Sequence, residues 1–147
     1  MSEPGAGQAL FSFVRHWSRR WDGTGDGERA ARGRDVLAVE AVNALAHRGE
    51  PTVNDVAAEL GLDQSNASRL LAHAADAGYL TLARSAVDQR RRTVTLTRSG
   101  HQLLTVAHAW QDDVYGVLTA DWTDAEREAF AHAIRRLVAK PPDFDAL

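Results

Sequence analysis

The feature that most constrains the fold is a change of hydrophobic period immediately after Gly78. Before it, apolar residues between 53 and 77 recur every three or four positions, which is typical of helices. After it, leucine and valine alternate with threonine and alanine along 80–83 and 93–96, which is typical of strands with one buried face. This order predicts a mostly α fold that contains a single small β-hairpin.

Further helices are expected on both sides of the hairpin. Apolar spacing predicts helices over 8–21, 34–48, 54–60, 63–77, 99–120 and 123–139. The glycine-rich stretch 22–33 predicts a loop, and Thr52 and Val53 predict a short strand. Asn54 and Asp63 are the expected N-caps of the two central helices, and Thr123 with Glu126 has the spacing of a capping box.

The segment 53–70 has the pattern of a helix-turn-helix. Gly61 can adopt the positive φ that the turn requires, and Ala57 is small where the two helices must approach closely. The expected shared core consists of Val56, Leu60, Leu62, Ala67 and Leu70. Short helix pairs with a central glycine also occur in proteins that never bind DNA, so this pattern alone does not establish a nucleic-acid interface.

The second helix of this pair has one polar face. At 100° per residue, the side away from the core carries Gln64, Ser65, Ser68 and Arg69. Glutamine can pair with adenine, arginine with guanine, and serine with a base or a phosphate. The alternative is an ordinary solvated face, and the helix by itself gives the two interpretations equal weight.

The tip of the hairpin favours the DNA interpretation. The protein has a net charge of −3, yet residues 84–98 contain five arginines and one acid, Asp88. Consecutive arginines at 90–92 repel one another unless an anion is near, and arginine is favoured in a narrow minor groove. We therefore expect Arg90, Arg91 and Arg92 to contact DNA, with Asp88 as an intramolecular partner that holds Arg90 in one pose. An ordinary charged turn is the alternative.

The central sequence resembles the multiple antibiotic resistance regulator (MarR) family. The resemblance rests on residues 56–62 (VAAELGL), 68–70 (SRL), 78–80 (GYL), 88–91 (DQRR) and 96–100 (LTRSG). It implies a winged helix-turn-helix, an obligate dimer with two DNA-reading lobes, and often a small aromatic effector bound between the lobe and the dimer layer. The expected fold is a winged helix-turn-helix over 34–98, with helical dimerisation regions at 8–21 and 99–139.

The outer helices need a partner for their apolar stripes. Self-association is the simplest solution, and two-fold symmetry would suit the two half-sites of a pseudo-palindromic operator in double-stranded DNA. The alternative is a monomer in which these helices cover one another. His16, Trp17 and Trp110 could line an effector pocket, although aromatic residues at helical spacing more often pack as dimer core.

Other classes of function find little support. The 147 residues contain no cysteine, which excludes disulfide scaffolds and thiolate zinc sites. The six histidines form no cluster that predicts a metal site, and we find no catalytic motif and no cofactor motif, so an enzyme is not expected. Without a signal peptide or a membrane span, the cytoplasm is the expected location. The sequence thus predicts a DNA-binding transcription regulator, a repressor released by an aromatic effector. A winged-helix protein-interaction module that does not bind DNA is the alternative.

Overall fold

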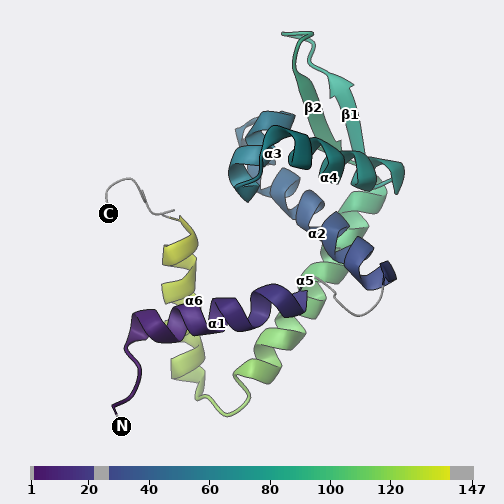
Figure 1. Cartoon of the computed structure of the whole chain (residues 1–147). Coiled ribbons are helices and arrows are strands. Elements are labelled where there is room, and N and C mark those ends of the chain that lie inside the picture. The colour runs from purple at the N-terminus through teal and green to yellow at the C-terminus, as the bar shows by residue number, and fades with distance from the viewer. Residues whose placement is uncertain (1, 22–26, 140–147) are drawn as a thin grey trace. The chain divides into compact units, whose positions relative to one another are not determined.

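The computed structural model of the chain describes residues 2–21 and 27–139 (Figure 1). Its elements are, in order, α1 (Ala6–Trp21), α2 (Gly27–Leu45), the short 3-10 helix η1 (Ala46–Arg48), α3 (Val53–Leu60), α4 (Gln64–Asp76), β1 (Leu80–Arg84), β2 (Arg92–Leu96), α5 (Arg98–Leu118) and α6 (Asp124–Ala139). They fall into two compact units, Met1–Ala107 and His108–Leu147. The expected fold class, mostly α with one small hairpin, is confirmed.

The core of the first unit lies where α2, α3, α4 and the hairpin meet, because α4 contacts both other helices and β1, and β2 contacts α2 and α3. Its fully buried side chains include Val39, Val42, Val56, Leu71 and Val94. Leu104 from the first half of α5 joins the same cluster. The three helices and the hairpin thus share one apolar core.

Helix α2 begins earlier than the sequence suggested. Residues 27–33, which we expected to be loop, are helical and continue without a break into the predicted helix. The sequence Glu28-Arg29-Ala30-Ala31-Arg32 consists of strong helix formers, and their combined preference outweighs the cost of Gly33. The rest of the expected loop, 22–26, lies outside the described residues.

Helix α3 is capped by Thr52, and not by Asn54 as we expected. The Thr52 hydroxyl accepts a hydrogen bond from the Asp55 backbone N–H (3.1 Å), and the Asp55 carboxylate accepts one from the Thr52 backbone N–H (2.8 Å). This reciprocal capping box starts the helix at Val53, so the short strand expected there reduces to one bridge between Thr52 and Thr93.

The turn between α3 and α4 follows the expected design. Gly61 adopts the left-handed conformation (φ 64°), and Asp63 caps α4 by accepting a hydrogen bond from the Asn66 backbone N–H (2.8 Å). One expected core residue is wrong, because Leu62 is 37% exposed. Its N–H bonds back to the carbonyl of Ala57, which places Leu62 in the turn and not on the face shared by the helices.

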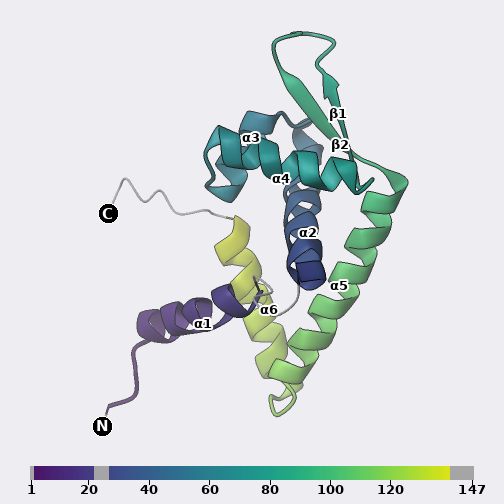
Figure 2. The ribbon, with the colours of Figure 1, turned by 45° about the vertical axis from the view of Figure 1, so that its right-hand side comes forward.

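The hairpin projects beyond the three helices, as both views of the molecule show (Figure 1, Figure 2). Its antiparallel register pairs Leu80 with Leu96 and Leu82 with Val94, which confirms the single apolar face read from the alternation. Leu80 and Val94 are buried at the base, whereas every residue from 86 to 92 is exposed. The hairpin is therefore anchored at one end and presents its tip to solvent.

The passage from β2 into α5 explains why Thr97 and Gly100 occur together. The Thr97 hydroxyl donates a hydrogen bond to the Gly78 carbonyl (2.6 Å) and accepts one from the Gly100 backbone N–H (3.1 Å). A Cβ at position 100 would lie only 2.2 Å from the Tyr79 carbonyl oxygen, so glycine alone fits this close approach. The turn after α4 and the start of α5 are locked together here.

The second unit is organised around the turn between α5 and α6. The expected capping box is confirmed, because Thr123 and Glu126 exchange hydrogen bonds of 2.8 and 3.2 Å. The Arg127 side chain donates to the carbonyl of the buried Thr119 (3.0 Å), and the ring of Phe130 stacks on Tyr115 at a centroid distance of 6.3 Å. These contacts fix the turn, but they leave no residue of α6 buried.

Candidate nucleic-acid interface

The outer face of α4 lies opposite its buried residues. Ala67, Leu71 and Ala74 are buried against the core. Of the four candidates on the other side, Gln64, Ser65 and Arg69 are exposed and Ser68 is half-buried. All four lie in the first half of the helix, where side chains and free backbone N–H groups can approach an anion or a base edge together.

Arg69 is not isolated on this face. Its guanidinium donates a hydrogen bond to the side-chain oxygen of Asn66 (2.8 Å), and the Asn66 amide donates to the Asp63 carboxylate (2.7 Å). Sequence reasoning missed Asn66, because an asparagine on an exposed helical turn gives no signal of its own. Its spacing of three residues from both Asp63 and Arg69 is the signal that was available.

The hairpin tip is a turn organised by Ser85, Asp88 and Arg91. The Ser85 and Arg91 backbones are joined by an N–H to carbonyl bond of 2.8 Å, and the Ser85 hydroxyl accepts hydrogen bonds from the backbone N–H groups of Val87 and Asp88. The Asp88 carboxylate accepts a hydrogen bond from the Arg90 backbone N–H (3.0 Å) and forms an ion pair with Arg91 (3.7 Å). Asp88 therefore holds the backbone of Arg90 and the guanidinium of Arg91, whereas we expected it to pair with the Arg90 side chain.

The arginine side chains of the tip differ in their surroundings. Arg91 lies beside Asp88, and its charge also helps to lower the pKa of Asp55 on α3, although the Thr52 hydrogen bonds are the larger cause. Arg90 and Arg92 line a shallow hollow on the side of the hairpin, together with Arg84 and Gln89. Three arginines around one hollow form a concentrated positive surface that suits a polyanion.

A buried carboxylate lies behind α4. Asp35 on α2 is only 5% exposed, and its Oδ1 lies 2.8 Å from Nδ1 of His73 on α4. An imidazole N–H that donates to this carboxylate compensates part of its desolvation. The contact also ties the second half of α4 to α2, which restricts how the helix can move relative to its support.

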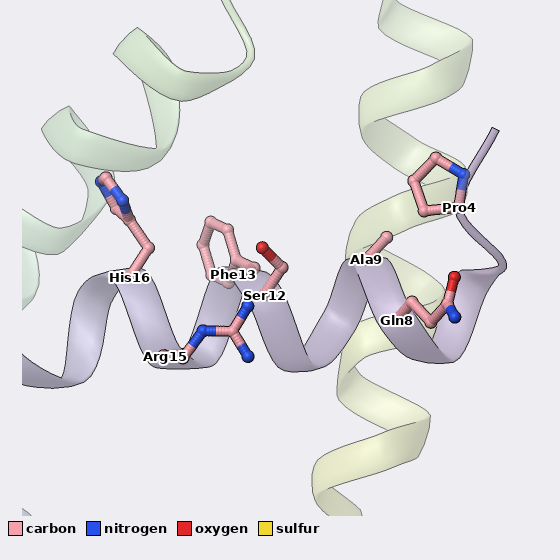
Figure 3. A pocket seen from close by; sticks show the side chains of 7 residues that line it. All are labelled: Pro4, Gln8, Ala9, Ser12, Phe13, Arg15 and His16. Carbon is pink, nitrogen blue, oxygen red and sulfur yellow. The ribbon is translucent and has the colours of Figure 1, made fainter. Parts of the chain in front are cut away.

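The effector candidates lie in both units. His16 and Trp17 are neighbours on α1 with their rings in edge contact (5.4 Å between centroids), whereas Trp110 lies on α5 in the second unit and is half exposed. Phe13 and His16 project from one side of α1 and border a surface hollow (Figure 3). All residues lining that hollow come from α1 and the segment just before it, so it is an open surface and not an enclosed cavity.

Residues 2–21 and 27–139 contain no group of three or more histidine, aspartate or glutamate side chains arranged to hold a metal ion. Over the same residues, no helix combines the length and the apolar character that a bilayer crossing requires.

Comparison with known proteins places this geometry in context. The MarR family model matches residues 33–91, which cover most of α2, the helix-turn-helix and the hairpin up to its tip. Among curated protein sequences, no relative matches.

Similarity to solved structures extends over nearly the whole chain. The crystal structure of MarR superposes with a TM-score of 0.72 at 19% identity, over 95% of this chain and 92% of that one. The complex of MepR from S. aureus with DNA gives 0.62 at 20% identity, over 93% and 98%. BpsR from Bordetella bronchiseptica, whose DNA binding is regulated by 6-hydroxynicotinic acid, gives 0.59 at 19% identity, over 88% and 98%. The family match over residues 33–91 and the shared fold show that this chain contains a winged helix-turn-helix similar to that of the MarR family.

Proposed function

We propose that this protein is a homodimeric repressor that binds a pseudo-palindromic operator and is released by a small aromatic effector. In each protomer α4 reads the major groove and the wing, defined as residues 85–91, enters the minor groove. The observation that carries this proposal is that the polar face of α4 and the arginine-rich hairpin tip are exposed in the same compact unit. A helix and a wing joined by one rigid core can contact neighbouring grooves with a fixed spacing.

In the major groove, Arg69 is the proposed base reader. Its guanidinium is exposed and can present two donors to a guanine, while Gln64 can pair with adenine. Ser65 and Ser68 are the right size to contact a phosphate or a base edge from the first two turns of α4. Arg69→Ala should weaken operator binding by about 1–3 kcal/mol and relax the preference at one half-site position.

In the wing, Arg90 is the proposed minor-groove residue. The Asp88 carboxylate holds its backbone N–H and engages Arg91, which leaves the Arg90 side chain on the hollow shared with Arg92. If Asp88 only added negative charge near DNA, Asp88→Ala would tighten binding. Because Asp88 orders the turn that carries Arg90, the variant should instead bind more weakly at every salt concentration.

Dimerisation is supported by the apolar side chains that the single chain leaves exposed. On α1 these are Leu10, Phe11, Phe13 and Val14, and on the second unit they include Trp110, Val117, Phe130, Leu137 and Val138. A surface this apolar on helices is typical of an association interface. Two copies related by two-fold symmetry would bring two α4 helices to two half-sites.

The effector part of the proposal rests on BpsR and on the aromatic residues. DNA binding by BpsR, which has the same fold, is regulated by an aromatic acid, 6-hydroxynicotinic acid. His16, Trp17 and Trp110 supply rings and a polar group suited to such a ligand, although aromatic residues at helical spacing more often pack as dimer core. A panel of aromatic acids, screened by thermal shift and by release of bound DNA, tests this directly.

The decisive experiment is a titration of the purified protein against a fluorescent DNA fragment from beside its own gene. Tight binding that weakens steeply with salt, and that exceeds binding to a random fragment, supports the proposal. Equal affinity for both fragments would contradict sequence-specific recognition of the DNA. Absence of salt-sensitive binding would favour a winged-helix module that contacts other proteins.

A further inference from the structure

The hydrogen bonds around Arg69 form a relay on the surface of α4. Asp63 caps the helix through the Asn66 backbone N–H (2.8 Å) and also accepts a bond from the Asn66 side-chain amide (2.7 Å). The Asn66 side-chain oxygen then accepts a bond from the Arg69 guanidinium (2.8 Å). The same asparagine is therefore connected to the cap of the helix on one side and to the proposed base reader on the other.

We propose that Asn66 is a specificity-determining positioning residue, which holds the Arg69 guanidinium in a fixed pose for recognition of one base. The inference rests on the proposed role of Arg69 and extends it. An exposed arginine samples many rotamers, and fixing it on contact with DNA costs conformational entropy. A guanidinium that is already held in the free protein loses less conformational entropy on binding DNA. Its affinity for a correctly placed guanine therefore exceeds its affinity for the other bases by a larger factor.

The chemistry of asparagine fits both ends of the relay. Its amide nitrogen is a donor and suits the Asp63 carboxylate, whereas its oxygen is an acceptor and suits the Arg69 guanidinium. With Asp63 and Arg69 as the partners, the orientation of the amide is determined, because the reversed amide would place like groups together at both contacts. The single guanidinium nitrogen used by Asn66 leaves the other donors of Arg69 for a base.

The test compares Asn66→Ala with Arg69→Ala on a set of duplexes in which each half-site base pair is changed in turn. Because Asp63 caps α4 through the backbone of Asn66, the alanine variant keeps the helix start, and thermal unfolding checks that it folds. We expect Asn66→Ala to reduce discrimination about three- to tenfold at the position that Arg69→Ala relaxes. The double variant should discriminate no less than Arg69→Ala alone.

A conservative variant separates specificity from affinity. Asn66→Asp keeps an acceptor for Arg69, but it loses the amide that donates to Asp63 and adds a negative charge beside DNA, so it should retain part of the discrimination while binding all duplexes more weakly.

Three results would overturn the inference, and they are distinguishable. If Arg69→Ala relaxes one position and Asn66→Ala relaxes none, the relay is unimportant although Arg69 still reads a base. If Asn66→Ala relaxes a different position, Asn66 contacts a base itself. If Arg69→Ala weakens binding to all duplexes equally, Arg69 is a phosphate contact, and the positioning role falls together with the proposed base reading.

Discussion

The segment from α2 to the hairpin and the outer helices α1 and α6 have comparable amphipathic sequences but place their apolar side chains differently. In the first region Val39, Val56, Leu71 and Val94 are fully buried within one chain. In α6 no residue is buried, and every described side chain of α1 is exposed or half-exposed. An apolar stripe on a helix needs another surface to cover it. The stripes from α2 to the hairpin are covered within their own chain, and we propose that a second copy of the chain covers those of α1 and α6.

The two regions also differ in what their polar contacts do. Between α2 and the hairpin, polar side chains fix the elements that carry the proposed interface, as Thr97 does at the start of α5 and Asp63 at the start of α4. In the second unit they fix a turn, through Arg127 and Tyr115. Substitutions in the two regions should therefore affect different measurements, namely the stability of the chain and the association of two chains.

The largest expected effect is on the closed core. Leu71→Ala removes a fully buried side chain from α4 and should lower the free energy of unfolding by about 2–5 kcal/mol, because a cavity remains. Leu37→Ala on α2 is the matched control, since Leu37 is 46% exposed and its truncation should cost about 1 kcal/mol or less. Urea unfolding at one fixed protein concentration measures both. Equal losses would contradict the assignment of the core.

The next effect is on association. Val14→Glu places a charge on the exposed apolar stripe of α1 and should raise the dimer dissociation constant about ten- to a hundredfold, because the charge would be buried without a partner. Ser12→Glu adds the same charge two residues away, about 200° around the helix, and should leave association unchanged. Light scattering at several concentrations distinguishes them. A wild-type protein that is monomeric at micromolar concentration while binding DNA would remove the dimer from the comparison.

A smaller effect is expected at the support of α4. His73→Ala removes the imidazole that lies 2.8 Å from the buried Asp35 carboxylate and should cost about 1–2 kcal/mol of unfolding free energy. Asp35→Asn in the His73→Ala background should recover part of this loss, because the buried charge is then gone. If the effects of the two substitutions on the free energy of unfolding are instead additive, His73 and Asp35 do not stabilise the protein as a pair.

Much of the fold could be predicted because several local signals agree with the tertiary structure. The alternation at Leu80 and Val94, the left-handed turn at Gly61 and the caps at Asp63 and Thr123 each combine a residue preference with a fixed position. Two of the errors in the fold occurred where two local signals competed. Gly33 suggested a loop within a segment of helix formers, and Asn54 was favoured as a cap although Thr52 forms a capping box with Asp55.

The candidate interface was less predictable, because its arrangement depends on side-chain directions. The exposed face of α4 follows from helical geometry, so Gln64, Ser65 and Arg69 could be placed in advance. The partner of Asp88 could not, since alternation along an extended segment favours Arg90 whereas the turn brings the Arg91 guanidinium to the carboxylate. Asn66 was missed for the same reason, because its importance comes from the contacts that its side chain makes with Asp63 and Arg69.

The smallest expected effect concerns Asp55, which contributes to the stability of the segment from α2 to the hairpin. Hydrogen bonds from the Thr52 backbone and side chain hold the pKa of Asp55 below its usual value of 3.8, and the charge of Arg91 adds to this. A carboxylate whose pKa is lower in the folded state stabilises the protein fully above pH 3.8, and this stabilisation is lost as the pH falls through the folded pKa.

Asp55→Asn keeps a polar side chain at the cap but removes its charge. The free energy of unfolding of the wild type should therefore exceed that of the variant by about 0.5 kcal/mol at neutral pH. This difference should stay constant from about pH 7 to about pH 5 and shrink towards zero at lower pH, because protonation of Asp55 then makes the two proteins alike. Urea unfolding across this range measures it.

Because α3 packs within its own chain, the difference should be the same at two protein concentrations tenfold apart, whereas the effect of Val14→Glu should depend on concentration. A pH-dependent difference that also changes with protein concentration would mean that the capping box of α3 is coupled to association. It would contradict the conclusion that the segment from α2 to the hairpin affects the stability of one chain and the outer helices affect the association of two.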